Sequence, residues 1–149
     1  MKSEKHIKVR KAQPEDFVAL AHLFLQSRRS AFRWQDAAQF KLEDFYTQTA
    51  GEVIFLAENE DGKLLGFISG WEADSFLHHL FISPQHQRAG IGTLLLNSLF
   101  SWLPLPYRLK CVAKNESALA FYRKNGFIEI GRGSGDDGEY VLLELATTR

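Results

Sequence analysis

The chain has 149 residues, of which 45% are hydrophobic, so it is long enough for a single domain with a sizeable core, which we expect to span residues 1–149. Its 18 basic and 18 acidic residues balance, which argues against nucleic acid as a partner because no basic excess is available to neutralise phosphates. A single cysteine excludes an internal disulfide, the charged start lacks the apolar core of a signal peptide, and no apolar run approaches the roughly 20 residues of a membrane span, so we expect a cytoplasmic protein with no membrane partner.

The first half of the chain predicts a strand, two helices and a β-hairpin. Alternating apolar and polar side chains predict the first strand, and Pro14, Glu15 and Asp16 are typical of a helix start. Asp61 followed by Gly62 is a favoured dipeptide at a hairpin turn. In chain order we expect a strand over 7–12, a helix from Pro14, a helix over 42–50, and strands over 52–58 and 64–71.

The second half predicts strands that alternate with helices. Its first helix ends where Pro104 and Pro106 cannot continue it. In chain order we expect a strand over 76–82, a helix over 90–103, a strand over 107–113, a helix over 116–125, and strands over 127–131 and 140–145, with a polar loop over 133–138. The full order βααβββαβαββ predicts the α/β class, with helices on both sides of a mixed sheet.

Two glycines stand where strand 76–82 turns into the following helix. Gly90 and Gly92 let the backbone approach a ligand closely, and a helix start offers unpaired N–H groups at the positive end of the helix dipole. These features predict a phosphate site. A dinucleotide fingerprint would need a third glycine where Leu95 stands, and the Gly-Lys-Ser/Thr of a P-loop is absent. The alternatives are an ordinary tight connection and a nucleotide-binding regulatory protein.

Two motifs indicate a family. Gln87, Gly90 and Gly92 fit the pattern Gln/Arg-x-x-Gly-x-Gly/Ala, which resembles the acyl-coenzyme A signature of the GNAT superfamily of N-acetyltransferases. Asn115 follows a strand and Tyr122 comes seven residues later in a helix that closes with Asn-Gly-Phe, which resembles the second GNAT signature. The resemblance covers nearly all of the chain. It implies a mixed, mostly antiparallel central sheet flanked by helices, with splayed strands at the cofactor site, and acetyl transfer from acetyl-coenzyme A to a primary amine by direct attack in a ternary complex.

The resemblance also implies which residues hold acetyl-coenzyme A (acetyl-CoA) as co-substrate. The pantetheine arm would bond to the backbone of strand 76–82 where it splays from strand 107–113, and the pyrophosphate would bond to N–H groups of the glycine turn. Asn115 is either a ligand contact or a plain helix cap, Gln87 contacts the ligand or braces the turn, and Arg88 bonds to phosphate or is solvated. The implied cofactor-binding residues are Leu80, Phe81, Ile82, Gln87, Arg88, Ala89, Gly90, Ile91, Gly92, Thr93, Asn115 and Tyr122.

Tyr122 matches the family position of the general acid. When an amine attacks the thioester, coenzyme A leaves as a thiolate whose pKa lies near ~8.5, and its departure gains from protonation. A phenol with an ordinary pKa near ~10 stays protonated at neutral pH and can donate that proton. The alternative is a half-buried aromatic side chain that anchors its helix.

The general base is expected on strand 76–82. His78 and His79 are adjacent there, and strand alternation predicts that only one of them faces the active site. We prefer His78 because it matches the water-linked base of the arylalkylamine-acetylating branch of the family. Other interpretations are a packed structural histidine, the carboxylates Glu72 and Asp74, or a water chain without a dedicated base.

The segment between the first two helices should form the acceptor site, since it walls that site in the family. Aromatic and arginine side chains there suit an amine with an apolar body and a carboxylate, although they are equally able to pack the helices or face solvent. The candidates are Arg28, Arg29, Phe32, Arg33, Trp34, Phe40 and Trp71.

Several negative features restrict the function. Members that acetylate protein N-termini carry a Glu where this chain has Lys110, so a small-molecule amine is favoured over a protein amine. The sequence shows no acidic cluster typical of a polyamine site, and neither HExxH nor a cysteine pair, so we expect no metal. A catalytically silent acyl-CoA sensor and a protein lysine or N-terminal acetyltransferase remain alternatives. A homodimer is a family expectation that the residues neither support nor exclude.

Overall fold

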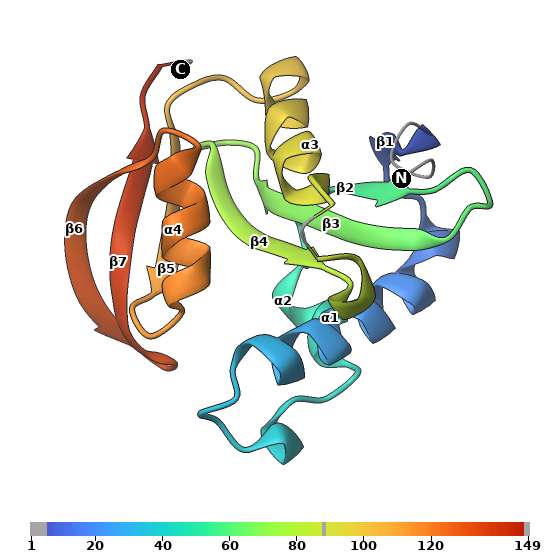
Figure 1. The fold of residues 1–149 in the computed structure, drawn as a ribbon, viewed down its shortest axis with the longest axis horizontal. Coiled ribbons are helices and arrows are strands. Elements are labelled where there is room, and N and C mark those ends of the chain that lie inside the picture. The colour runs from blue at the N-terminus through green and yellow to red at the C-terminus, as the bar shows by residue number, and fades with distance from the viewer. Residues whose placement is uncertain (1–5, 88, 148–149) are drawn as a thin grey trace.

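The computed structural model describes residues 6–87 and 89–147, which form a seven-stranded sheet with helices on both faces (Figure 1). The strands are β1 Lys8–Lys11, β2 Val53–Glu58, β3 Leu64–Trp71, β4 Phe76–Ile82, β5 Tyr107–Val112, β6 Ile128–Gly135 and β7 Gly138–Leu145. The helices are α1 Phe17–Ala31, α2 Asp44–Gln48, α3 Ile91–Ser98 and α4 Glu116–Lys124, with short 3-10 helices at Pro14–Asp16, Ala37–Gln39, Pro84–His86 and Leu99–Ser101.

The sheet order is β1-β2-β3-β4-β5-β7-β6, and every described neighbouring pair is antiparallel except β4 with β5. One buried cluster joins α1 and α2 to the face that carries Phe67. A larger cluster joins α3 and α4 to the face that carries Ile68. Strand alternation sends Phe67 and Ile68 to opposite faces, so one strand supplies both cores. The expected mixed, mostly antiparallel sheet flanked by helices is confirmed.

Three expected elements differ from the structure. The helix expected over 42–50 shrinks to α2, and the helix expected over 90–103 loses its α-helical form after Ser98. The polar loop expected over 133–138 is wrong, because β6 and β7 run through it and leave a two-residue turn. Gly133 pairs with Tyr140, and a Cβ at Gly133 would collide with the Tyr140 ring, so the glycine makes room for an aromatic side chain that lies across β6.

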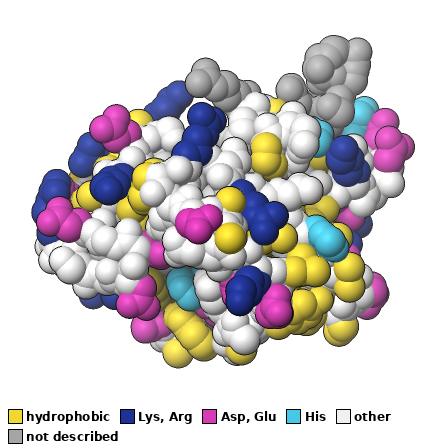
Figure 2. Space-filling view, turned by 90° about the horizontal axis from the view of Figure 1, so that it is seen from below, with side chains coloured by type: hydrophobic (Ala, Val, Ile, Leu, Met, Phe, Trp, Pro, Cys, Tyr) yellow, Lys and Arg dark blue, Asp and Glu magenta, His cyan; other side chains and the backbone are white. Residues whose placement is uncertain are grey.

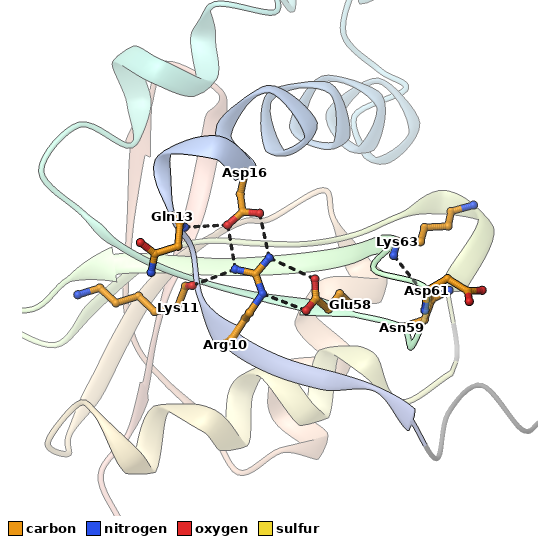
Figure 3. A network of polar contacts seen from close by, with 8 residues as sticks. All are labelled: Arg10, Lys11, Gln13, Asp16, Glu58, Asn59, Asp61 and Lys63. Atoms are coloured by element: carbon orange, nitrogen blue, oxygen red, sulfur yellow. Dashed lines mark hydrogen bonds and ion pairs between the residues drawn. The ribbon is translucent and has the colours of Figure 1, made fainter.

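An ionic network fastens the start of the chain to the sheet (Figure 3). The Arg10 guanidinium donates to both Asp16 carboxylate oxygens at 2.9 Å and, through Nε, to Glu58 at 3.0 Å. Asp16 also accepts from the Gln13 backbone N–H at 2.7 Å, which closes a capping box at the helix start. Arg10 therefore links β1, β2 and the entrance to α1.

The surface mixes charges of both signs. On the face shown in Figure 2, Lys and Arg side chains alternate with Asp and Glu side chains and do not gather by sign. This matches the equal numbers of basic and acidic residues. Among the described residues, no helix has the length and apolar character needed to cross a membrane.

Candidate active site

A fork in the sheet creates the main groove. β4 and β5 pair in parallel at Phe76 with Arg108 and at Leu77 with Leu109. Beyond that point the described residues of β4 and β5 no longer pair with each other. The expected splayed strands are therefore present. The groove that follows has a volume of about 1190 Å³ and is lined by the end of β4, the glycine turn, the start of α4 and the end of α1.

The two glycines of the turn do different work. Gly90 has φ +81° and N-caps α3, and a Cβ built there would meet no atom within 4 Å, so this face of the turn is open. A Cβ on Gly92 would instead lie 3.1 Å from the Phe121 ring, so this glycine lets α3 pack closely against α4. The first N–H groups of α3 have no intrahelical partner, and Gly90 offers them no side-chain cap. The turn therefore suits a bound phosphate.

The groove collects most of the expected cofactor-binding residues. Gln87 Nε2 donates to the Ile82 carbonyl oxygen at 3.0 Å, which holds the turn against β4. Ala89 is half-buried beside the groove, and Arg88 lies outside the described residues. The expected residues that line the groove are Leu80, Phe81, Ile82, Gln87, Gly90, Ile91, Gly92, Thr93, Asn115 and Tyr122.

Asn115 and Tyr122 enter the groove from α4. Asn115 caps that helix by accepting from the Ala118 N–H at 3.3 Å, and it also borders the groove, so capping does not remove it from the site. The Tyr122 ring packs against Phe121 and Phe127, with centroids 5.3 and 5.5 Å away. Burial raises the pKa of the Tyr122 phenol above its ordinary value of 10, so the hydroxyl remains a proton donor at neutral pH.

The two histidines stand where the fork begins, in a β-bulge. The β3–β4 register passes from Ser69 opposite His79 to Gly70 opposite Leu77, which leaves His78 as the extra residue. A Cβ on Gly70 would lie 2.5 Å from the Phe76 carbonyl oxygen, so glycine allows the tight pairing next to the bulge. The bulge also brings the two rings together, with centroids 3.9 Å apart.

The two histidines nevertheless have different surroundings. His79 is buried beside Phe24, whose ring centroid is 4.9 Å away, and burial is the largest cause that lowers the His79 pKa to about 3. It is therefore neutral. The His78 side chain is 41% exposed, and its Nδ1 contacts the Glu52 carboxylate. Neither ring lines the groove itself.

Glu52 is a residue that the sequence analysis missed. Its side chain has no exposed surface, and its second carboxylate oxygen accepts from Ser69 Oγ at 2.8 Å. Glu52 lies 26 positions before His78 in a strand-initiating position, so no spacing rule connects the two. The signal was a lone acidic residue before the apolar run of β2. The alternative carboxylates Glu72 and Asp74 are exposed between β3 and β4 and do not line the groove.

Comparison with known proteins identifies the family. The family model described as Acetyltransferase (GNAT) family matches residues 17–127. The chain belongs to the GNAT acetyltransferase family. It is 33% identical over 125 residues to the peptidyl-lysine N-acetyltransferase YiaC of Escherichia coli, covering 80% of this chain and 82% of YiaC. It is 30% identical over 146 residues to the peptidyl-lysine N-acetyltransferase YjaB of the same organism, covering 94% and 96%.

Solved structures share the fold. The solution structure of apo YjaB from Escherichia coli superposes with a TM-score of 0.77 at 23% identity, covering 93% of this chain and 97% of that chain. The PaiA N-acetyltransferase of Thermoplasma acidophilum in complex with coenzyme A superposes with a TM-score of 0.78 at 21% identity, covering 95% and 99%. With the family shown, this GNAT protein is an acetyl-CoA-dependent N-acetyltransferase that acts on amines.

The arginines expected to bind the acceptor mostly serve the fold of this GNAT enzyme. Arg28 is buried, pairs with Asp44 at 3.1 Å and lies over the Phe24 and Phe40 rings at 4.0 and 4.7 Å. Arg29 donates to the carbonyl oxygens of Ala37 and Phe40, which ties the α1–α2 segment to α1. These two guanidinium groups are therefore occupied by the protein itself.

The remaining acceptor candidates divide among the groove, the surface outside it and the core, to which Phe40 belongs. Arg33 and Trp34 line the groove, and Phe32 supports Trp34 with ring centroids 5.3 Å apart. Trp34 is 39% exposed and Trp71 is 43% exposed, but Trp71 lines neither described hollow and lies against Gly51.

A second hollow of about 510 Å³ adjoins Trp34. The turn between β6 and β7 brings Asp136 and Asp137 to it, and Gln35 Nε2 donates to Asp137 Oδ1 at 3.5 Å. Glu116 and Glu139 also line this hollow, with Lys114 as the basic member. The acidic run Asp136, Asp137 and Glu139 thus meets Glu116 beside the groove, which gives this hollow the acidic lining that the sequence analysis did not expect.

Proposed function

We propose that this enzyme acetylates a primary amine by direct attack on acetyl-CoA bound in the fork. The amine nitrogen forms a bond to the thioester carbonyl carbon, the carbon–sulfur bond breaks, and the sulfur leaves with its electron pair. Tyr122 supplies the proton to that sulfur, supported by its position on the groove wall and its raised pKa. The single observation that carries this proposal is the fork, with the open Gly90 turn on one side and the Glu52–His78 contact at its start.

The proton lost by the attacking amine passes to His78. Glu52 holds Nδ1 of this ring, which leaves Nε2 to receive the proton directly or through water. Ser69 fixes the other carboxylate oxygen, so the ring has a buried, doubly anchored partner. His79 is a poorer base because burial lowers its pKa to about 3, so its ring holds an accepted proton only weakly.

The acceptor is a lysine side chain in a peptide or protein. Two observations support this choice over the small-molecule amine favoured by the sequence alone. The acid-lined hollow at Asp136 and Asp137 attracts a cationic chain, and exposed Trp34 offers an apolar surface to its methylene groups. Two relatives, at 33% and 30% identity, are peptidyl-lysine N-acetyltransferases.

Thiol release with a panel of amines tests the acceptor. The panel contains a peptide with one internal lysine and a blocked N-terminus, the same peptide with arginine for lysine, a peptide with a free N-terminus, spermidine and an arylalkylamine. We expect turnover with the lysine peptide and a mass increase of one acetyl group on lysine. Turnover with spermidine or the arylalkylamine alone would restore the small-molecule assignment, and no turnover with any amine would favour an acyl-CoA sensor.

A matched pair of tryptophan variants locates the acceptor. Trp34→Ala should raise KM for the lysine peptide by about 10-fold while KM for acetyl-CoA changes little, since the lost contact is to the acceptor. Trp71→Ala, which removes a side chain of similar exposure outside both hollows, should change neither constant. Equal effects of the two variants would contradict this placement of the acceptor.

Three further expectations complete the proposal. Residues 1–149 act as one domain, the enzyme works in the cytoplasm, and it forms a homodimer as the family resemblance implies. Sedimentation at several concentrations measures the last of these, and a single monomeric species up to high concentration would exclude the dimer.

A further inference from the structure

Three side chains with metal-binding atoms meet at the bulge of β4. Glu52, His78 and His79 each place one ligand atom within 4.8 Å of the other two. No local sequence pattern indicates this cluster, because the chain has neither HExxH nor a cysteine pair. The bulge creates it by turning adjacent histidines toward one another, and the start of β2 adds the carboxylate.

The three groups are chemically suited to a transition metal. Two imidazoles and one carboxylate form a donor set that Zn²⁺ and its first-row neighbours prefer. His79 is neutral, as a metal-bound imidazole must be, and its buried Nε2 has no hydrogen-bond partner among the described residues. The Glu52 side chain lacks exposed surface, yet among the described side chains only Ser69 and His78 form a hydrogen bond or ion pair with its carboxylate.

The cluster also has an opening and room to adjust. Tetrahedral zinc with bonds near ~2.0 Å places its ligand atoms about 3.3 Å apart. The direct Glu52–His78 contact must therefore open, while His79, whose ligand atom lies within 4.8 Å of the other two, stays in reach. His78 provides that adjustment because its side chain is 41% exposed, and the same exposure gives an ion access from solvent. A fourth position on the solvent side would be taken by water.

We propose that Glu52, His78 and His79 form a binding site for a divalent transition metal of the Zn²⁺ class, and that its occupation inhibits acetyl transfer. The ion displaces the direct Glu52–His78 contact and takes the ring nitrogens as ligands. Metal binding stands on the cluster alone, whereas inhibition rests on the proposed role of His78 as base. This metal is an inhibitor of the enzyme and not a cofactor of the reaction.

Direct binding tests the site without any acetyl acceptor. The untagged full chain is stripped with a chelator and titrated with Zn²⁺ by calorimetry, and with Co²⁺ by visible absorption. We expect one ion per chain for the wild type, with affinity reduced at least about 10-fold in Glu52→Gln and in His78→Asn. The proposal would be overturned if both variants kept the Zn²⁺ affinity of the wild type, or if the wild type bound no Zn²⁺.

Matched variants separate this site from adventitious ligands. His6→Asn removes an exposed histidine that faces Glu60 at 3.6 Å, and Cys111→Ser removes the chain's single thiol. Both should bind Zn²⁺ like the wild type, and loss of binding in either would assign the ion elsewhere. Circular dichroism confirms that each variant is folded, and the exposed position of His78 makes its variant the decisive one.

The inhibition arm uses the acetylation assay. Zn²⁺ should inhibit the wild type with the same affinity that calorimetry reports, and excess chelator should restore the rate. Binding without inhibition would show that the metal site exists and that His78 is not the base. A wild type that binds Zn²⁺ but acetylates no amine would overturn the proposed function and leave the metal site standing.

Discussion

The buried Glu52 carboxylate contacts Nδ1 of His78 across the intervening strand β3, at the point where β4 leaves β5. Ser69 on β3 anchors the same carboxylate from between them. The contact therefore depends on three strands and on the bulge at His78. It joins the exposed His78 ring at the start of the fork to a carboxylate side chain with no exposed surface.

Glu52→Gln should lower kcat/KM for the amine about 10- to 100-fold. The neutral amide no longer gives His78 a negatively charged partner when the ring accepts the proton of the amine. Glutamine keeps the shape of glutamate and can still bond to Ser69, so the melting temperature should change little. Glu60→Gln, in the exposed pair with His6, is the control and should leave the steady-state constants unchanged. Comparable losses of kcat/KM in the two variants would show that Glu52 has no specific role in the reaction.

Tyr122→Phe should lower kcat about 100-fold with little change in KM for acetyl-CoA, because only the proton donor is lost. The ring contacts with Phe121 and Phe127 remain, so the fold should persist. Since the pKa of Tyr122 is raised, the phenol stays protonated throughout the neutral range and should add no ionisation there to the rate profile. Undiminished turnover in the variant would exclude Tyr122 as the acid.

Gly90→Glu should weaken acetyl-CoA binding at least about 10-fold, because a carboxylate at the start of α3 repels the phosphates. Gly62→Glu is a matched control, since both glycines have φ +81° and no atom within 4 Å of a built Cβ. Both variants carry a similar backbone strain of about 1 kcal/mol. Calorimetry with acetyl-CoA, ATP and NAD shows whether the site is selective for acetyl-CoA. If both variants lost the same affinity for acetyl-CoA, the loss would come from reduced protein stability and not from the site.

Arg28→Ala should destabilise the protein by about 2–3 kcal/mol, because it leaves Asp44 without its partner and removes a side chain packed between two rings. Arg33→Ala, at the groove, should cost less than about 0.5 kcal/mol. Urea unfolding measures both. If the two variants were equally stable while Arg28→Ala lost acceptor binding, Arg28 would be assigned to the acceptor site.

Asp16→Asn should cost about 1 kcal/mol near pH 7, because it weakens the Arg10 network. The bond from Arg10 lowers the pKa of folded Asp16 below its ordinary 3.8, so this stabilisation is complete above that value and is lost as the pH falls through the folded pKa. Urea unfolding of both proteins at pH 7 and at pH 3 should show the gap shrinking on acidification. A constant gap would mean that the charge on Asp16 contributes nothing.

Local sequence signals were sufficient where an apolar run is bounded by turn residues. Residues 64–71 and 76–82 are strands with the expected bounds, because their apolar runs are bounded by turn residues. The prediction of a loop around Gly133 was wrong because a glycine-rich polar segment resembles a loop. Only the opposing Tyr140 ring explains why this strand needs a glycine.

The site was predictable in its cofactor half and much less so in its acceptor half. Gly90, Asn115 and Tyr122 come from contiguous motifs and converge on the groove. Glu52, by contrast, meets His78 through sheet register, and the one-residue bulge that brings the two histidine rings together has no local sequence signal. The side chains of the α1–α2 segment depended on tertiary packing, which turned Arg28 inward.

The parting of β4 from β5 also makes the stability of the enzyme depend on its ligand. Beyond Leu77 and Leu109 the described edges of the two strands no longer supply each other with hydrogen bonds. We propose that the acyl-CoA arm lies between them and bridges the β1–β4 part of the sheet to the β5–β7 part. By mass action, ligand at 100 times its Kd adds about 2.7 kcal/mol to the free energy of unfolding. We therefore expect the melting temperature of this protein to rise with the concentration of acetyl-CoA.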